Sequence, residues 1–340
     1  MNMPASSFSP PAVLPAGAGL SPLVGKGPLR ALLPGGSRAP AIMIYHRVRP
    51  ERDALFPDEI DRAGFARHIA WLKSSCRIMP LADAVRHMRA GTLPPRTACI
   101  TFDDGYADNA EIALPVLQHY GVSATFFVAS GFLNGGRMWN DSVIELVRRM
   151  PGDTLDAGAF GLGVHSLATP ALRAQAIIAL LNKLKYLPLE ERQQQVDRLA
   201  AHFSVALPGD LMMSDVQVRQ LHRSGMTIGA HTVQHPILSR LSPSEARAEI
   251  ADGKQALERL IDAPVSLFAY PNGRPGTDYE AAHVQMVREL EFEAAVSTSV
   301  GTAGAYPDLY QLPRFTPWDR NHWRFALRLA ANLTRPAILA

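Results

Sequence analysis

Residues 100–106 read Ile100-Thr101-Phe102-Asp103-Asp104-Gly105-Tyr106, an apolar run that ends in two adjacent carboxylates and a glycine. The apolar lead-in is short and contains β-branched and aromatic residues, so it predicts a buried strand over 98–102 that Gly105 breaks. Acidic side chains at the carboxyl end of a strand lie where α/β folds place their catalytic and ligand-binding residues. Adjacent like charges are also costly unless a cation or a proton lies beside them. The alternative is that Asp104 or Asp108 only caps a helix that begins near Ala107.

The composition is that of a globular chain without a strong charge bias. Its 340 residues are 47% hydrophobic, which is enough for one large α/β domain or two smaller ones. The formal net charge is only +3, and no block of basic residues occurs, so nothing suggests nucleic acid as a partner. The two cysteines, Cys76 and Cys99, are too few for a disulfide framework and fit a reducing compartment.

The first 39 residues are rich in Pro, Gly, Ala and Ser and predict a flexible arm. This arm does not resemble a secretory signal, because its first basic residue is Lys26 and prolines interrupt its apolar run. No later segment reaches the ~18 consecutive apolar residues that span a membrane. We therefore expect a cytoplasmic protein.

The tail, residues 319–340, contains a predicted helix over 319–333 in which apolar residues are mixed with arginines. Such an amphipathic helix either docks on the core or contacts an anionic membrane surface. The second alternative would place the protein at the periphery of the inner membrane. The sequence does not indicate the oligomeric state.

Short strands and helices alternate along the chain from residue 41. The predicted strands lie at 41–45, 77–79, 98–102, 123–129, 226–230, 265–270 and 294–297, and helices are predicted at 62–73, 81–89, before Gly121, and at 243–261. Strand, helix and strand at short separations predict parallel pairing with right-handed crossovers. The fold class is therefore α/β, either a barrel or an open sheet.

A mostly helical insertion is predicted at 139–223, between two of these strands. Its helices are expected at 142–149, 170–186, 190–203 and 214–223. The insertion is either a lid or substrate-facing subdomain, or it packs on the outside of the main domain. At its start, Trp139 and Asp141 are candidates for stacking on a sugar ring and orienting it, although Asp141 could simply cap the following helix.

A pair of histidines follows the strand predicted at 226–230. His231 and His235 are four residues apart, so both imidazoles can face one point. The spacing is typical of metal ligands but also occurs on ordinary helix faces. Together with one carboxylate of the Asp103-Asp104 pair, the histidines would make a three-ligand site with open positions. The second carboxylate could then accept a proton from an attacking water molecule.

Two motifs in this order resemble those of the polysaccharide deacetylases, the NodB-homology or carbohydrate esterase family 4 proteins. They are Thr101-Phe102-Asp103-Asp104-Gly105 and His231-Thr232-Val233-Gln234-His235. Tyr45-His46-Arg47-Val48 is similar to the subgroup that contains bacterial exopolysaccharide deacetylases. The resemblance spans residues 40–318 and implies a distorted (β/α) barrel with a divalent metal ion, commonly Zn²⁺, that removes an acetyl group from a sugar.

The resemblance also implies roles for individual residues. Asp103 matches the catalytic base, and Asp104, His231 and His235 match the metal ligands. Thr232 matches the small hydroxyl residue that supports the second motif.

The third motif departs from the family pattern. In Phe268-Ala269-Tyr270-Pro271-Asn272-Gly273, an alanine stands where the family usually has the arginine that pairs with the base, and Asn272 stands in place of an aromatic residue. Arg274 or Arg314 could replace the arginine from another direction. Asn272 keeps the backbone N–H that helps to hold the oxyanion in the family, although the turn is otherwise an ordinary tight loop.

The family's last motif supplies a histidine as general acid, and this chain lacks it. Leu312-Pro313-Arg314-Phe315 occupies that region, and His322 lies beyond it in a predicted helix. His46 ends a strand and is a candidate for the acid, or it is a hydrogen-bonded residue of the barrel mouth without a chemical role.

The resulting hypothesis is a metal-dependent deacetylase that acts on an N-acetylated amino sugar in a polysaccharide, an oligosaccharide or a lipid-linked glycan. One alternative is a hydrolase of another amide, such as a ureide-like compound, which the altered third motif motivates. The other alternative is a non-catalytic metal- or glycan-binding protein, which the missing arginine and acid would favour.

Overall fold

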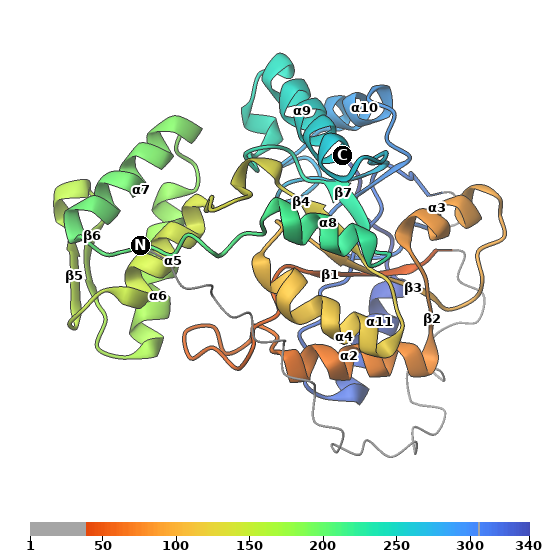
Figure 1. Cartoon of the computed structure of the whole chain (residues 1–340), viewed down its shortest axis with the longest axis horizontal. Helices are drawn as coiled ribbons and strands as arrows, with labels where there is room; N and C mark the ends of the chain where they lie inside the picture. The colour runs from red at the N-terminus through yellow and green to blue at the C-terminus, as the bar shows by residue number, and fades with distance from the viewer. Residues whose placement is uncertain (1–38, 305–306) are drawn as a thin grey trace, which may run out of the picture.

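The computed structural model describes residues 39–304 and 307–340, so the predicted arm lies outside the described residues apart from Ala39. A parallel seven-stranded sheet forms the centre of the protein (Figure 1). Its order is β1-β3-β4-β7-β8-β9, with β2 beside β3. The strands are β1 Ala41–Tyr45, β2 Arg77–Ile78, β3 Thr97–Phe102, β4 Thr125–Val128, β7 Thr227–Ala230, β8 Leu267–Ala269 and β9 Ala294–Val296.

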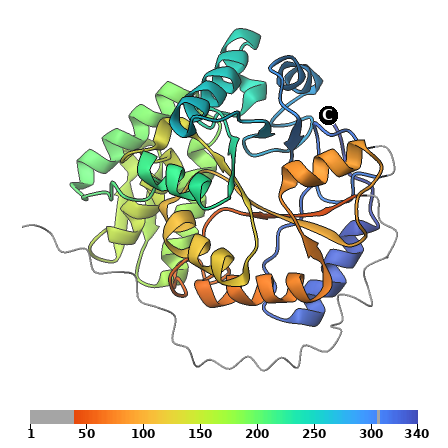
Figure 2. The same cartoon turned by 45° about the vertical axis from the view of Figure 1, so that its right-hand side comes forward.

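The helices of the main domain lie around the outside of the curved sheet, and the insertion lies to one side (Figures 1 and 2). Several begin at side-chain caps, including Ser214 and Ser242, each of which closes a capping box. The helices are α2 Arg62–Ser75, α3 Leu81–Arg89, α4 Leu114–Tyr120, α5 Trp139–Arg149, α6 Pro170–Leu184, α7 Leu189–Phe203, α8 Asp215–Arg223, α9 Pro243–Ile261, α10 Ala281–Glu289 and α11 His322–Leu333. Gly121 ends α4 in the left-handed conformation, as its sequence position predicts.

A short segment after β9 closes the sheet into a distorted barrel. The backbone of Leu312 pairs with β9, and the backbone of Phe315 exchanges hydrogen bonds of 2.8–3.0 Å with β1. The two edges of the sheet are thereby joined through residues 312–315. The predicted α/β barrel is confirmed, and the closing segment carries Arg314 into its interior.

Successive side chains of each strand point to opposite faces of the sheet, so the strands contribute to two separate apolar cores. Met43, Ile100 and Phe126 belong to the core between the sheet and the surrounding helices. Their neighbours Cys99 and Phe127 belong to a second core inside the barrel, which α3 also contacts. A Cβ atom at Gly229 would lie 2.4 Å from the ring of Phe127, so only glycine fits there on β7.

The insertion is mostly helical, as predicted, but it also contains a hairpin. Strands β5 Thr154–Ala157 and β6 Gly163–Ser166 pair antiparallel. The helices α5, α6 and α7 and this hairpin share their own apolar core, which Leu55 from the loop after β1 joins. The hairpin is missing from the sequence prediction because each strand has only four residues, the lower limit of a recognisable strand pattern.

The C-terminal helix docks on the core. Phe325 and Leu329 of α11 are fully buried, and Phe325 contacts the rings of His68 and Trp71. The outer face of this helix remains exposed, including Trp323 and Leu327. Within the described part of the chain, no helix is both long and apolar enough to cross a membrane.

Candidate active site

The two aspartates at the end of β3 point in different directions. Asp103 continues the alternation of Cys99 and Thr101 and therefore points into the barrel. Asp104 follows with a φ angle of 76°, and Gly105 with 93°. Asp108 forms a 2.7 Å ion pair with Arg47 and makes no helix-capping bond, so the capping alternative is not observed for it.

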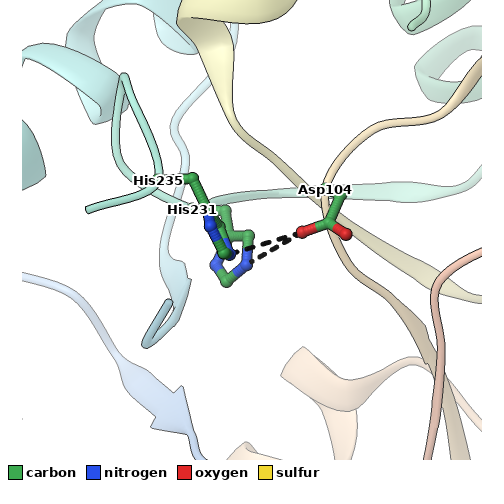
Figure 3. Close-up of side chains that lie close together, drawn as sticks. All are labelled: Asp104, His231 and His235. Atoms are coloured by element: carbon green, nitrogen blue, oxygen red, sulfur yellow. Dashed lines mark ion pairs between the residues drawn. The ribbon is translucent and has the colours of Figure 1, made fainter. Parts of the chain in front are cut away.

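Asp104, His231 and His235 form a cluster of potential metal ligands (Figure 3). The Nε2 atoms of both histidines lie 3.5 Å from Asp104 Oδ1, and one ligand atom from each residue falls within 4.8 Å of the others. Asp104 Oδ1 is buried and has no hydrogen-bond partner among the described residues. Two imidazole nitrogens and one otherwise unsatisfied carboxylate oxygen fit a divalent cation such as Zn²⁺.

Hydrogen bonds orient the two histidines toward this point. His231 Nδ1 lies 2.7 Å from the carbonyl oxygen of Ala269 on β8, which leaves Nε2 for a metal. The Thr232 hydroxyl accepts a 3.1 Å bond from the N–H of His235. The first contact orients the His231 ring toward Asp104, and the second fixes the backbone that carries His235.

Helix α9 supports the histidine loop from behind. Glu249 accepts 2.9 Å bonds from the backbone N–H groups of Val233 and Gln234. A Cβ atom at Gly253 would lie 2.8 Å from the backbone of Thr232, so a glycine lets the helix approach this closely. The sequence analysis did not identify Glu249, because its contact depends on how α9 packs.

The backbone at the site is strained. Nine described residues other than glycine have positive φ angles, and four of them are Asp104, Thr232, His235 and Asn272. Such conformations cost about 1–3 kcal/mol each and persist where the surroundings enforce them. A β-branched residue such as Thr232 rarely adopts this conformation. The strain therefore marks the loops after β3, β7 and β8 as a candidate functional centre.

Arg314 occupies the place beside Asp103 that the third motif leaves open. Its Nη1 and Nη2 atoms each lie 2.6 Å from an oxygen of Asp103, and its Nε donates to the carbonyl oxygen of Ser297 at 2.9 Å. Arg314 is 1% exposed and Asp103 is 2% exposed. Arg274 is exposed, and its backbone N–H binds Asp278 instead.

Burial and charge act in opposite directions on the site's pKa values. Burial alone would raise the pKa of Asp103, but the Arg314 guanidinium and His231 lower it below its usual value. The pKa of Asp104 is also lowered, because its contacts with the histidines outweigh burial. Burial lowers the pKa of His235 to about 4, so its imidazole is neutral at neutral pH and can bind a metal.

His46 and Asn272 lie near the cluster. His46 is exposed, close enough to influence the pKa values of Asp104 and His235. Asn272 lines a cavity of about 310 Å³ together with Asp104 and His235. Its backbone N–H donates to no described residue. His322, by contrast, is the first residue of α11 and stacks on the ring of Trp71.

The insertion supplies the other wall of this cavity. Trp139 lines it, as expected of a residue that could stack on a sugar. Asp141 is 3% exposed and accepts bonds of 3.1 and 3.2 Å from the hydroxyl of Tyr106. It makes no capping bond, and burial raises its pKa to about 7.

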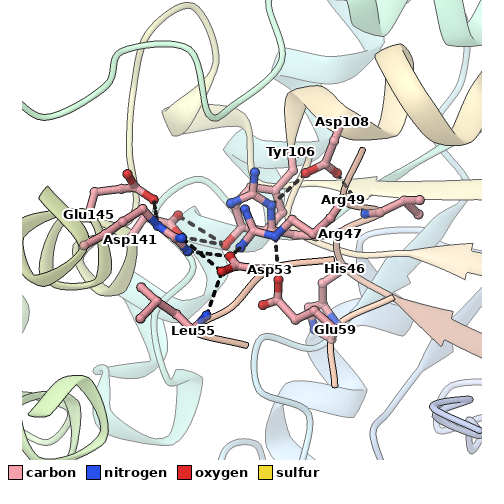
Figure 4. A network of polar contacts seen from close by, with 12 residues as sticks. His46, Arg47, Arg49, Asp53, Leu55, Glu59, Tyr106, Asp108, Asp141 and Glu145 are labelled. Atoms are coloured by element: carbon pink, nitrogen blue, oxygen red, sulfur yellow. Dashed lines mark hydrogen bonds and ion pairs between the residues drawn. The ribbon is translucent and has the colours of Figure 1, made fainter. Parts of the chain in front are cut away.

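A network of partly buried charged and polar side chains lies where the insertion meets the barrel (Figure 4). Arg148 of α5 forms bonds of 3.0 and 2.6 Å with Asp53 in the loop after β1. Arg49 in the same loop pairs with Glu59, and the Arg47 guanidinium lies 4.5 Å from the ring of Tyr106. The Arg148–Asp53 and Tyr106–Asp141 contacts join the insertion to the barrel, and the other two lie within the barrel domain.

The histidine loop provides a direct test of metal binding. We expect His235→Ala to lower the affinity for Zn²⁺ by more than about 100-fold, because losing even an outer partner of a ligand costs 10–100-fold. The measurement is a titration of the metal-free protein with Zn²⁺ followed by calorimetry. His119→Ala is the control, because His119 is exposed on α4. Equal affinities of His235→Ala and the wild type would contradict the ligand assignment.

Comparison with known proteins agrees with this arrangement. The sequence model described as polysaccharide deacetylase matches residues 90–295, more than half of the chain. The chain belongs to the polysaccharide deacetylase family. A candidate polysaccharide deacetylase of Bacillus subtilis, YxkH, is 21% identical over 275 residues, which are 80% of this chain and 69% of the relative.

A second relative of this deacetylase chain matches over a shorter segment. The poly-beta-1,6-N-acetyl-D-glucosamine N-deacetylase of Staphylococcus aureus is 29% identical over 87 residues, which are 25% of this chain and 30% of the relative.

Two solved structures share the deacetylase fold. The deacetylase PplD of Streptococcus pyogenes, solved in complex with acetate, has a TM-score of 0.58 at 18% identity and covers 86% of this chain and 98% of its own. IcaB of Ammonifex degensii has a TM-score of 0.57 at 19% identity, and the match covers 86% of this chain and 97% of IcaB. At these identities the likeness shows the fold alone, and it confirms the NodB-type barrel.

Proposed function

We propose that this deacetylase is a metal-dependent hydrolase that removes the acetyl group from an N-acetylated amino sugar in a polysaccharide, an oligosaccharide or a lipid-linked glycan. The observation that carries the proposal is the unsatisfied, buried Asp104 Oδ1 between two imidazoles, with a second carboxylate beside it. The name of the Staphylococcus aureus relative supports an N-acetylated amino sugar as substrate.

A divalent metal held by Asp104, His231 and His235 would polarise the acetyl carbonyl and lower the pKa of water. Asp103 is the base that accepts a proton from the attacking water, and its lowered pKa keeps it ionised for this role.

Two further residues act on the reacting amide in this proposal. The backbone N–H of Asn272 donates to the developing oxyanion, and a donor in that position is worth about 2.7–4 kcal/mol in the transition state. His46, exposed near the metal cluster, is the candidate for protonating the departing nitrogen. Arg314 does not touch the substrate and acts by holding Asp103 in place.

The domain limits and the location are also proposals. We assign residues 40–318 to the deacetylase barrel, including the insertion 139–223, and residues 319–340 to the terminal helix and tail. Trp323 and Leu327, together with the arginines of α11, are the exposed groups that would contact an anionic membrane surface. The cytoplasmic location rests on the sequence alone.

Acetate release from N-acetylated chitooligosaccharides tests the proposed activity. We expect the protein loaded with Zn²⁺ to release acetate, a chelator to stop the reaction, and added Zn²⁺ to restore it. Ureides and small linear amides form the comparison panel. Hydrolysis of these compounds without acetate release from any glycan would favour the alternative amide hydrolase, and metal binding without any hydrolysis would favour a non-catalytic protein.

A further inference from the structure

Two neighbouring cavities lie between the insertion and the loop after β7. The first, of about 310 Å³, is lined by the proposed ligands Asp104 and His235. The second has a volume of about 480 Å³. Lys185, Arg192 and Ile237 line both cavities. A glycan longer than one sugar would therefore extend from the metal cluster past these three side chains.

Arg192 in the first turn of α7 is a buried cation to which the described part of the chain supplies no counter-charge. It is 6% exposed, and its Nε atom has no hydrogen-bond partner among the described residues. Its Nη1 atom donates to the carbonyl oxygen of Lys185 at 3.2 Å, and its guanidinium lies 4.7 Å from the ring centroid of Trp139. Neither contact neutralises the charge, and a buried charge is costly unless it is paired.

Two other arginines near the site are paired with carboxylates. Arg314 binds Asp103, and Arg148 binds Asp53. Arg192 differs from them, because no described carboxylate forms an ion pair with it.

Lys185, beside Arg192 in space, also lacks an ion pair within the described ranges. It is half buried at the end of α6, and its Nζ atom lies 5.8 Å from the ring centroid of Tyr186. Among the acidic residues that line the second cavity, Glu245 accepts bonds from Ser242 in the capping box of α9, and Glu190 is exposed. The wall shared by the two cavities is therefore cationic.

We propose that Lys185 and Arg192 form an anion subsite that binds a carboxylate or phosphate group of the glycan, next to the sugar whose acetyl group is removed. Arginine binds such groups through several N–H donors, and lysine adds a point charge. An occupying anion would give Arg192 the counter-charge and the Nε partner that it lacks. The inference rests on the proposed function for the position of the acetylated sugar, but the anion subsite can be measured without turnover.

Calorimetric binding of two probes of equal length to the full chain tests the subsite, with a chelator present so that neither probe is deacetylated. Hyaluronan hexasaccharide carries a carboxylate on every second sugar, and chitohexaose is neutral. We expect the hyaluronan probe to bind at least about tenfold more tightly at low salt, which corresponds to about 1.4 kcal/mol. Acetate release by the Zn²⁺-loaded protein is measured separately, so failure of the proposed function and failure of the subsite are distinguished.

Substitutions of Lys185 and Arg192 test whether these two residues cause the preference for the anionic probe. In Lys185→Gln and in Arg192→Gln, we expect the ratio of the two dissociation constants to fall to near one, whereas Arg192→Lys retains part of it. Arg198→Gln is the matched control, because Arg198 is exposed on the same helix and lines neither cavity. Arg192 is buried, so thermal melting is used to show whether Arg192→Gln folds. Lys185 is only half buried, and Lys185→Gln therefore supplies a second test.

A second pair of probes tests whether the bound anion is a phosphate rather than a carboxylate. N-acetylglucosamine 1-phosphate is compared with N-acetylglucosamine in the same titrations. Tighter binding of either anionic probe, lost in both variants, supports the subsite and names carboxylate or phosphate as its ligand. Equal binding of charged and neutral probes by the wild type, or a preference that survives in both variants, would overturn it. A preference lost only in Lys185→Gln would overturn the assignment of Arg192.

Discussion

Replacement of Asp103 with Asn lowers kcat by about 10²–10⁴-fold, while the protein still binds one divalent metal ion. The expected loss is the usual contribution of a positioned general base. Asparagine keeps the shape of the side chain but cannot accept a proton at neutral pH. The metal remains because its proposed ligands are the neighbouring Asp104 and the two histidines. Acetate release and metal content are measured on the same preparation.

The control for this experiment must show that lost charge pairing alone does not stop catalysis. Asp103→Asn also removes the negative partner of the buried Arg314, which destabilises the protein. Asp308→Asn disturbs an ion pair with another arginine, Arg288, and neither residue lines the cavity at the metal cluster. We expect Asp308→Asn to retain turnover. An Asp103→Asn variant with near-normal kcat would show that another group is the base.

Local patterns in the sequence are sufficient to predict most of the barrel. Each strand predicted for the sheet is present, and α9 begins and ends where its caps and apolar spacing predict. The cluster of Asp104, His231 and His235 could be anticipated because strand ends at one rim of a parallel barrel meet in space. These features depend on short stretches whose geometry is set by their own residues.

Features that depend on distant packing could not be predicted in the same way. Arg314 meets Asp103 from 211 positions away in the chain, through the closing segment 312–315, which has no regular strand pattern. The sequence offers Arg274 and Arg314 as candidates, and the structure brings Arg314 to Asp103 and leaves Arg274 exposed. Arg192 is a similar case, since its burial depends on how α7 packs against Trp139. A charged residue in a first helical turn is ordinarily exposed.

Replacement of Arg314 with Met should destabilise the protein by about 3–5 kcal/mol at pH 7, because it leaves the Asp103 carboxylate buried without a partner. The measurement is urea unfolding of the metal-free protein. Arg288→Met is the control. Arg288 is half exposed beside Asp308, and an exposed pair of this kind contributes about 0–1 kcal/mol. Equal stabilities of Arg314→Met and the wild type would show that the ion pair contributes nothing to folding.

The pH dependence of this loss has a defined sign. In the wild type the pKa of Asp103 lies below its unfolded value, so its contribution to stability is present above about pH 3.9 and is lost as the pH falls through the folded pKa. Without Arg314, burial is the largest remaining influence and raises that pKa, so protonation relieves the buried charge. The stability difference between Arg314→Met and the wild type should therefore shrink as the pH falls from 7 toward 4.

The same shift should appear in catalysis. If Asp103 is the base, the acid limb of kcat/KM moves to higher pH in Arg314→Met, because the carboxylate takes up a proton earlier. Arg314→Lys retains a positive charge but loses the paired N–H geometry, so its acid limb should lie between those of the wild type and Arg314→Met. An unchanged acid limb in both variants would mean that Arg314 stabilises the barrel without controlling the protonation of Asp103.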